Sequence, residues 1–455
     1  MPPRTTRPPH GILLGWQDPP GRGRKSEFPS AIWDDSREGH HITIAPTGAG
    51  KGVSCIIPAL LTWRGPTIII DPKGENYAVT AARRRAMGQK VHVLDPFGLT
   101  DCLQRASLNP FDMLGPLKKA TIDDMRVLAN AAIQQHAFGK HQDPYWDNRA
   151  ATLITEAIGY CATNLPAPTL TDVNTVVRTY DEHTGMTEYV SAKGSCHPDI
   201  GHVFSPPGMA MGRTRSSITS TAMDHLAFIT DGAVAGSLWR STIDLKKVVR
   251  GDPMTIYIVI PPNKLVTHSK LLRLWLVTLL TAISRRHAAP KIPTLFLIDE
   301  AAQLGELKEL VSAVTLMRGY GMKVWSFWQD LSQLTKLYPH AWETILNNSS
   351  IHQYFGATTP MAAKKLQDYL TDTCPRPISN LAPNQTALYR PHQPGAVVRL
   401  PNYLTDPMFQ GLYDPNPFYP RHAELTLVDD EFDYDVQETD SGTVLHFPPR
   451  EERDA

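Results

Sequence analysis

Seven short runs of apolar residues, separated by segments with helical spacing, constrain the fold of this chain more than any other feature. The runs cover residues 41–45, 67–71, 90–95, 254–260, 294–299, 322–327 and 350–355. They are continuously apolar or nearly so, as expected for strands that are buried on both faces of a parallel sheet. Strands that alternate with helices predict an α/β domain with a mainly parallel central sheet.

This pattern of strands is interrupted by a long segment with helical spacing only. Residues 145–165 and 169–182 are predicted helices, and residues 201–221 are a predicted loop that returns to the main domain. The sequence thus predicts four parts: an N-terminal extension (1–40), a discontinuous α/β domain (41–106 and 226–427), an inserted all-α domain (107–225) and an acidic tail facing solvent (428–455).

A turn with two glycines and one lysine joins the first apolar run to a helix in IAPTGAGKGVSCIIP, residues 44–58. Phosphate-binding loops have the pattern GxxxxGK[ST] between a strand and a helix, because backbone N–H groups and the lysine surround the phosphates there. Two positions differ from this pattern. Ala45 replaces the first glycine, and Gly52 replaces the hydroxyl residue that ordinarily binds Mg²⁺. The predicted nucleotide-binding residues are Thr47, Gly48, Ala49, Gly50, Lys51, Gly52, Val53 and, after the second apolar run, Asp71.

A pair of acids, Asp299 and Glu300, ends the apolar run that begins at residue 294. In a P-loop ATPase, the first acid of such a pair lies near Mg²⁺ and the second polarises the attacking water. Asp299 is therefore the predicted metal ligand and Glu300 a predicted catalytic residue, with ATP and Mg²⁺ as cofactors. The long separation of Lys51 from Asp299 is consistent with a domain inserted between them.

Charge limits how this chain can contact nucleic acid. The 45 Lys and Arg residues balance 45 Asp and Glu residues, so any contact with DNA is expected to be local. The basic cluster 83–85 is interpreted as solvated surface. The longest apolar run, residues 271–283, is shorter than the ~20 residues that span a bilayer and predicts a buried helix.

Residues 46–85, and the stretch IIIDPKGEN (68–76) in particular, resemble the VirD4/TraG-type coupling proteins, which are motor ATPases of conjugation and type IV secretion. Further matching stretches follow in the same order. They include HVLDPFG (92–98), SLNPFDML (107–114), LIDEAAQLG (297–305) and PNYLTDPMF (401–409). The resemblance covers about residues 40–415 and implies a RecA-like motor domain of the FtsK/HerA class with an inserted all-α domain.

The resemblance also implies a function and a set of partners. It implies an ATP-driven translocase of DNA or nucleoprotein that assembles as a homo-hexamer. Arg318 would act in trans on the γ-phosphate of a neighbouring subunit, and Gln329 would act as a sensor. DNA and a relaxase or other secretion-system proteins are the implied partners. Coupling proteins commonly begin with transmembrane helices. None is predicted here, so we expect a cytoplasmic protein that a partner recruits to the inner membrane.

Two alternative functions remain open from the sequence. One is an adaptor that uses nucleotide as a switch while it recruits relaxase or effector proteins. The absent hydroxyl at Gly52 favours this alternative. The other is a DNA-processing or defence ATPase that acts with a partner nuclease.

Overall fold

The chain forms two compact units, residues Met1–Asp414 and Pro415–Ala455. The computed structural model describes residues 11–17, 30–36, 39–115, 117, 120–133, 144–182, 213–356, 360–370, 377–390, 392–418, 435–439 and 442–446. The first unit contains an 11-stranded sheet. In the second unit, β12 (Asp435–Thr439) and β13 (Gly442–His446) pair as an antiparallel hairpin, which the sequence does not predict within the acidic tail.

The central part of the sheet is parallel, and its strand order is β9-β3-β8-β7-β4-β6-β5. The bounds of these strands are β3 (His40–Ile44), β4 (Thr67–Ile70), β5 (Lys90–Leu94), β6 (Met254–Ile258), β7 (Thr294–Ile298), β8 (Met322–Trp328) and β9 (Ser349–Phe355). They are the seven strands that the apolar runs predict. Most of their residues are buried, as expected for strands covered on both faces.

Four antiparallel strands extend the sheet beyond β9, in the order β10-β11-β1-β2. Their bounds are β10 (Gln385–Tyr389), β11 (Ala396–Arg399), β1 (Ile12–Gln17) and β2 (Ser30–Asp34). The sequence predicts none of them. In particular, β1 and β2 lie in the segment that is predicted to be an extension. Strands β2, β10 and β11 contain polar or charged residues and lack the continuous apolar runs of most of the parallel strands, whereas β1 (ILLGWQ) is apolar up to Gln17 and was missed.

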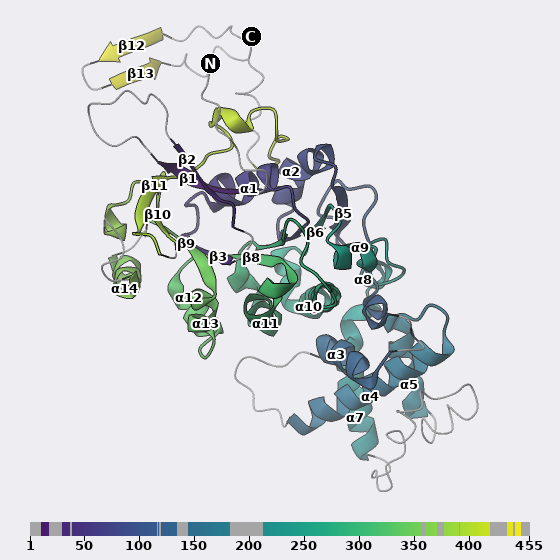
Figure 1. The fold of residues 1–455 in the computed structure, drawn as a ribbon. Helices are drawn as coiled ribbons and strands as arrows, with labels where there is room; N and C mark the ends of the chain where they lie inside the picture. The colour runs from purple at the N-terminus through teal and green to yellow at the C-terminus, as the bar shows by residue number, and fades with distance from the viewer. Residues whose placement is uncertain are drawn as a thin grey trace. The chain divides into compact units, whose positions relative to one another are not determined.

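Helices cover both faces of the sheet (Figure 1). One face carries α1 (Ile57–Thr62) and α2 (Glu75–Ala86), and the other carries α10 (Pro262–Ser284), α11 (Lys308–Leu316), α12 (Leu331–Leu337) and α13 (Trp342–Asn347). The strands alternate between two cores. In β4, for example, Ile68 and Ile70 pack in the core with α10, and Ile69 packs in the core with α1 and α2. Helix α14 (Pro360–Leu370) follows β9.

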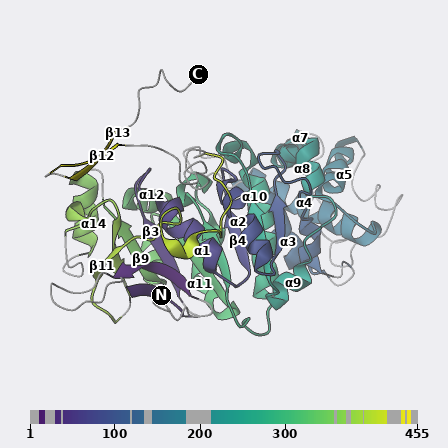
Figure 2. The ribbon, with the colours of Figure 1, turned by 90° about the horizontal axis from the view of Figure 1, so that it is seen from above.

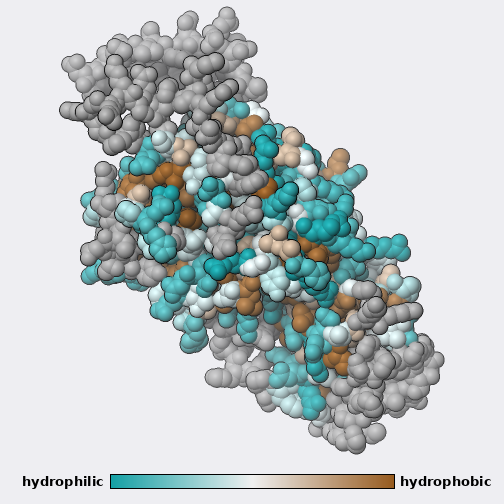
Figure 3. Space-filling view, in the orientation of Figure 1, coloured by the Kyte–Doolittle hydropathy of each residue, from teal (hydrophilic) through white to brown (hydrophobic). Residues whose placement is uncertain are grey.

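Helix α10 contains the apolar run 271–283, so the predicted buried helix is confirmed. Among the described helices, none combines the length and the hydropathy needed to cross a membrane. In the view of Figure 3, hydrophilic and hydrophobic residues are interspersed over the described surface.

The described residues between β5 and β6 form helices and no strand. These elements are η2 (Pro110–Leu114), α3 (Ile122–Ala132), α4 (Pro144–Asn164), α5 (Leu170–Glu182), α7 (Arg213–Leu226), η4 (Ala227–Thr230), α8 (Gly232–Ser237) and α9 (Leu245–Arg250). Figure 2 shows α3, α4, α5, α7 and α8 grouped at one end of the sheet. We call η2 and α3 to α9 the helical block. The predicted domain boundaries at residues 107 and 225 stay a prediction.

The prediction of a loop at residues 201–221 is wrong for the second half of this segment. Residues 201–212 lie outside the described residues, but residues 213–221 begin helix α7. This segment is rich in Ser, Thr and Arg, and these residues hide its apolar spacing. Ile218, Ala222 and Leu226 are four residues apart and all are buried, so they form one inward face of a helix.

The basic cluster 83–85 is also not wholly solvated, because the Arg84 side chain is completely buried under α2. Its guanidinium donates hydrogen bonds to acceptors in and after α1 and on two strands, β4 and β6. These acceptors are the carbonyl oxygens of Leu60, Trp63 and Gly65 and the hydroxyl groups of Thr67 and Thr255. Burial lowers the pKa of Arg84 to about 10, so the group stays charged at neutral pH.

Candidate active site

The turn after β3 has the backbone geometry of a phosphate-binding loop. Its first residue, Ala45, donates its backbone N–H to the carbonyl of Trp328, which ties the turn to β8 (2.8 Å). Gly48 and Gly50 have φ values of +76° and +83°, which glycine adopts without strain. A π-helical turn, η1 (Gly52–Ile56), follows and continues into α1. The N–H groups at this helix start provide an environment that favours anions.

Lys51 lies against both predicted acids. Its Nζ is 3.2 Å from Glu300 Oε1 and 3.5 Å from Asp299 Oδ1. The lysine follows β3 and the acids follow β7, and β8 lies between these strands. Because all three strands are parallel, their carboxyl ends meet at one edge of the sheet. The three side chains are 14–19% exposed, so little solvent screens their charges.

Asp299 has an oxygen that suits a cation. Its Oδ1 is buried and, apart from the ion pair with Lys51 at 3.5 Å, has no hydrogen-bond partner within the described part of the chain. Burial raises the pKa of Asp299, although the Lys51 ammonium opposes this shift. A hard divalent cation such as Mg²⁺ prefers carboxylate oxygens, and its charge would offset the cost of burying a negative carboxylate. The residues present therefore fit Mg²⁺.

Glu300 has a left-handed backbone conformation, with a φ of 53°. This is uncommon for a residue other than glycine and is characteristic of functional sites. The residues that follow do not form one continuous helix but the three shorter elements η5 (Ala301–Leu304), α11 and η6 (Met317–Tyr320). The Glu300 carboxylate accepts hydrogen bonds from Lys51 and from the side-chain amide of Gln303. In this conformation the carboxylate contacts the phosphate-binding loop through Lys51.

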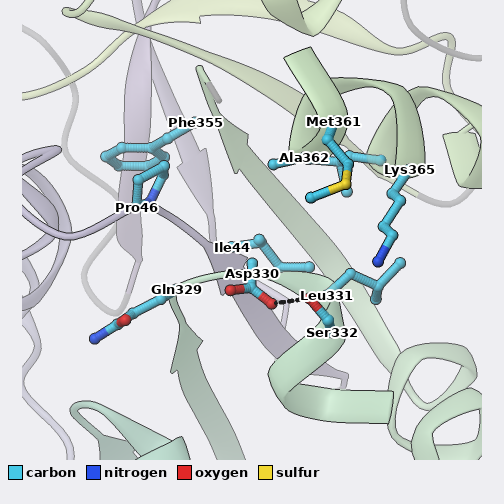
Figure 4. A pocket seen from close by; sticks show the side chains of 11 residues that line it. Ile44, Pro46, Gln329, Asp330, Leu331, Ser332, Phe355, Met361, Ala362 and Lys365 are labelled. Atoms are coloured by element: carbon cyan, nitrogen blue, oxygen red, sulfur yellow. Dashed lines mark hydrogen bonds between the residues drawn. The ribbon is translucent and has the colours of Figure 1, made fainter. Parts of the chain in front are cut away.

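Gln329 is the first residue after β8, so it lies on the same edge between Lys51 and the two acids. Its backbone and side chain exchange hydrogen bonds with Gln333. Gln329 is among the residues that line a cavity of 180 Å³, together with Pro46, Asp330 and Lys365. In Figure 4 the amide end of the Gln329 side chain points away from the side chains of Asp330 and Lys365. The role of Gln329 as a sensor stays a prediction.

Arg318 lies at the opposite ends of the parallel strands from Lys51, where their amino ends meet. It precedes β8, whose seven residues end at Trp328, opposite Ile44 of β3. At about 3.3 Å per residue, β8 separates Arg318 from the phosphate-binding loop by about 20 Å. Burial, with smaller effects from nearby cations that include Arg318, lowers the pKa of His40 to about 4, which places this arginine near the start of β3. Arg318 is exposed and does not reach Lys51 of its own chain.

A cavity of 580 Å³ lies beside the phosphate-binding loop. Its lining combines the loop with the end of β9 and the segments around β10 and β11: Thr47, Gly48, Ala49, Gly50, Val53, Ser54, Phe355, Gly356, Ile378, Ser379, Leu381, Pro383, Asn384, Leu400, Pro401 and Asn402. The volume is typical of small-molecule sites. The residues after Phe355 are not predicted as site residues. The stretch PNYLTDPMF is the one sequence signal near them, and it specifies no role.

Asp71 lies behind this site and does not line the cavity. It follows β4, is 1% exposed, and accepts hydrogen bonds from the backbone N–H of Tyr77 (2.9 Å) and the side-chain amide of Asn76 (3.3 Å). Burial, with a smaller effect from the charge of Asp299, raises the pKa of Asp71 to about 7. A direct contact of Asp71 with nucleotide stays a prediction.

We expect the Asp71→Asn substitution to remove part of the pH dependence of stability. The carboxyl has a pKa of about 7 in the folded chain and an ordinary value of 3.8, so the folded state binds more protons between these values. The free energy of unfolding of the wild type should therefore fall as pH rises through this window, by up to about 1.4 kcal/mol per pH unit relative to the variant. Urea unfolding of both proteins at several pH values measures this, and parallel curves would contradict it.

The strand order, the glycine turn with Lys51 and the acids after β7 define the class of this protein: it has a RecA-like P-loop NTPase fold. Residues 18–374 match the sequence profile of the family "Type IV secretory system Conjugative DNA transfer". This match covers well over half of the chain, so the chain belongs to that family.

Individual relatives agree with the family assignment. The conjugal transfer protein TraG of Escherichia coli is 28% identical over an alignment of 344 residues, which covers 71% of this chain and 52% of the relative. Protein VirD4 of Agrobacterium fabrum is 30% identical over 348 residues, 72% of this chain and 50% of the relative. The chain thus spans about half the length of these relatives. The structure of the plasmid coupling protein TrwB in complex with ADP and Mg²⁺ is similar in fold, with a TM-score of 0.61, 16% identity, and coverage of 86% of this chain and 94% of TrwB.

Proposed function

We propose that this chain is an ATP-driven motor that moves DNA, or DNA with bound protein, in a conjugative or type IV secretion system. The convergence of Lys51, Asp299 and Glu300 at one sheet edge, in a member of a conjugative DNA-transfer family, carries this proposal. ATP and Mg²⁺ are the proposed cofactors. The complex of the fold neighbour TrwB with ADP and Mg²⁺ supports them.

The predicted phosphate-binding, metal-binding and catalytic residues at this sheet edge have separate roles in the proposed reaction. The amides of residues 48–52 and the Lys51 ammonium hold the phosphates, and Asp299 holds Mg²⁺. When bound, Mg²⁺ supplies positive charge that offsets the charge on the phosphate oxygens. Glu300 orients a water molecule for attack on the γ-phosphate and accepts its proton. The 580 Å³ cavity beside Thr47–Val53 is the proposed place of the nucleoside.

The opposite position of Arg318 supports a ring in which the site is completed between subunits. An arginine on the far edge of the sheet is able to reach a phosphate only if another copy presents its phosphate-binding loop there. We therefore propose a homo-hexamer with Arg318 acting in trans and Gln329 reporting the state of the γ-phosphate. DNA would contact the ring locally, because the chain has no net charge. A relaxase or other secretion-system protein would deliver the DNA, and a membrane partner would recruit the ring.

The ATPase rate with and without single-stranded and double-stranded DNA tests the proposed function. A motor should turn over ATP faster with DNA, because translocation and hydrolysis are coupled. The second candidate, a nucleotide-switched adaptor, is favoured by the absence of a hydroxyl at Gly52. Nucleotide binding without any stimulation by DNA would contradict the motor and support the adaptor.

We expect Gly52→Ser to bind Mg²⁺ with nucleotide more tightly than the wild type. A Cβ built at Gly52 meets no atom within 4 Å, so serine fits without a clash. Its hydroxyl would add the ligand that most P-loops provide at this position. We expect a gain of about tenfold in Mg²⁺ affinity, or about 1.4 kcal/mol, in Mg²⁺ titrations of nucleotide binding. Gly52→Ala is the matched control, since it adds the same carbon without the oxygen. An equal gain in Gly52→Ala would contradict the prediction.

A further inference from the structure

Helix α10 and the residues just after it contact both ends of residues 309–321, the segment that contains most of α11 and Arg318. At the first end, Arg273 Nε donates a hydrogen bond to Glu309 Oε1, in the first turn of α11 (2.8 Å). At the other end, Arg286 Nη1 donates to the carbonyl oxygens of Tyr320 (3.0 Å) and Gly321 (3.2 Å). Arg318 lies between these two attachments. The position of its turn therefore depends on α10.

Arg273 also contacts the helical block. Its Nη1 donates a hydrogen bond to the carbonyl oxygen of Ile133, the residue that ends α3 (2.9 Å). One guanidinium thus joins the end of α3 to the start of α11. The planar fork of arginine suits two such contacts in fixed directions, whereas a lysine ammonium lacks this geometry.

The ion pair between Arg273 and Glu309 is largely shielded from water. The Arg273 side chain is 20% exposed and the Glu309 side chain 13%. The second carboxylate oxygen, Glu309 Oε2, is buried and has no hydrogen-bond partner among the described residues. Separating the pair would leave a buried carboxylate uncompensated, which is costly. A displacement of the end of α3 is therefore expected to move Arg273 and Glu309 together.

We propose that Arg273 is a positioning residue that couples the helical block to the nucleotide site. Helix α11 lies between Glu300, which acts in its own subunit, and Arg318, which acts on the next. A change at the end of α3 would alter both groups through Arg273 and Glu309. This proposal rests on the proposed function. Because coupling between sites is reciprocal, nucleotide bound at Lys51 must also change the stability of α3.

Reciprocity allows a test that requires no knowledge of the partner of the helical block. The full chain is studied by hydrogen–deuterium exchange with and without the analogue ADPNP and Mg²⁺, and the amides of α3 (122–132) are followed. We expect nucleotide to slow their exchange about fivefold in the wild type. Arg273→Lys keeps the charge but not the planar guanidinium. In this variant, the ratio of the exchange rates without and with nucleotide should approach one. Glu309→Gln should behave similarly and serves as a second variant if Arg273→Lys does not fold.

Arg285→Gln is the matched control. Arg285 is the residue that ends α10 and also contacts α3, through Asp124 Oδ1 (3.1 Å), and it donates a second hydrogen bond to the carbonyl oxygen of Met113 rather than to α11. A purely structural loss of contact with α3 would speed exchange equally with and without nucleotide. Arg285→Gln should therefore change absolute exchange rates and keep the fivefold ratio.

The outcomes separate this proposal from the proposed function. If ADPNP binds and the exchange of α3 does not respond, the coupling is wrong and the nucleotide site stands. The coupling is also wrong if Arg273→Lys keeps the full ratio or if Arg285→Gln loses it equally. If ADPNP does not bind, as a direct binding titration would show, the proposed function fails and the coupling fails with it.

Discussion

Replacing Glu300 by glutamine should abolish steady-state ATP hydrolysis while nucleotide still binds. The substitution keeps the size of the side chain and removes the carboxylate that would orient water and accept its proton. General-base catalysis contributes typically about 10² to 10⁴-fold, so we expect kcat to fall by at least about 100-fold. The Lys51 ammonium also loses a charged neighbour at 3.2 Å, which competes with phosphate for it. Nucleotide affinity should therefore be unchanged or higher.

The measurement for Glu300→Gln combines an ATPase assay, with and without DNA, and a nucleotide-binding titration. Glu306→Gln is a suitable control, because it makes the same chemical change at an exposed position six residues further along. A Glu300→Gln protein with more than about a tenth of the wild-type rate would exclude Glu300 as the general base. Loss of nucleotide binding would instead indicate a structural role for the Lys51–Glu300 pair.

Replacing Arg318 by alanine should reduce kcat about 1,000-fold. Part of the lost activity should return when the Arg318→Ala protein is mixed with a second inactive variant. Arginines that act in trans contribute 10³ to 10⁵-fold to phosphoryl transfer in other NTPases. The second variant is Lys51→Met, which lacks the phosphate-binding lysine and keeps Arg318. In a randomly mixed ring, about one quarter of the interfaces would combine an intact Lys51 with an intact Arg318.

Activity well above that of either variant alone would place Arg318 at the site of a neighbouring subunit. Arg126→Ala, at an exposed position of the helical block, controls for a general effect of removing a positive charge. The same mixing with Arg126→Ala in place of Arg318→Ala tests whether subunits exchange. If subunits exchange and the inactive pair stays inactive, a role of Arg318 in trans is contradicted.

The sequence alone was sufficient for the parallel part of the sheet, because strands buried on both faces are apolar, or nearly so, along their length. All seven of these strands follow from that requirement, and the loop at Lys51 follows from its own glycine and lysine pattern. The four antiparallel strands do not. In β1, for example, Trp16 packs in a third core with Tyr403 and Phe409, which are nearly 400 residues away. Such a strand depends on partners that local spacing does not indicate.

The residues of the candidate site were likewise predictable where their chemistry is local. Glycines in left-handed conformations, a lysine before a helix and acids at a strand end have one-dimensional signatures. Tertiary structure alone decided three further features. It joined segments around residues 355, 380 and 401 to the loop as one cavity, it buried Arg84 against strands, and it placed Arg318 about 20 Å from the lysine of its own chain. Each depends on distances between segments far apart in sequence, which only the packed sheet determines.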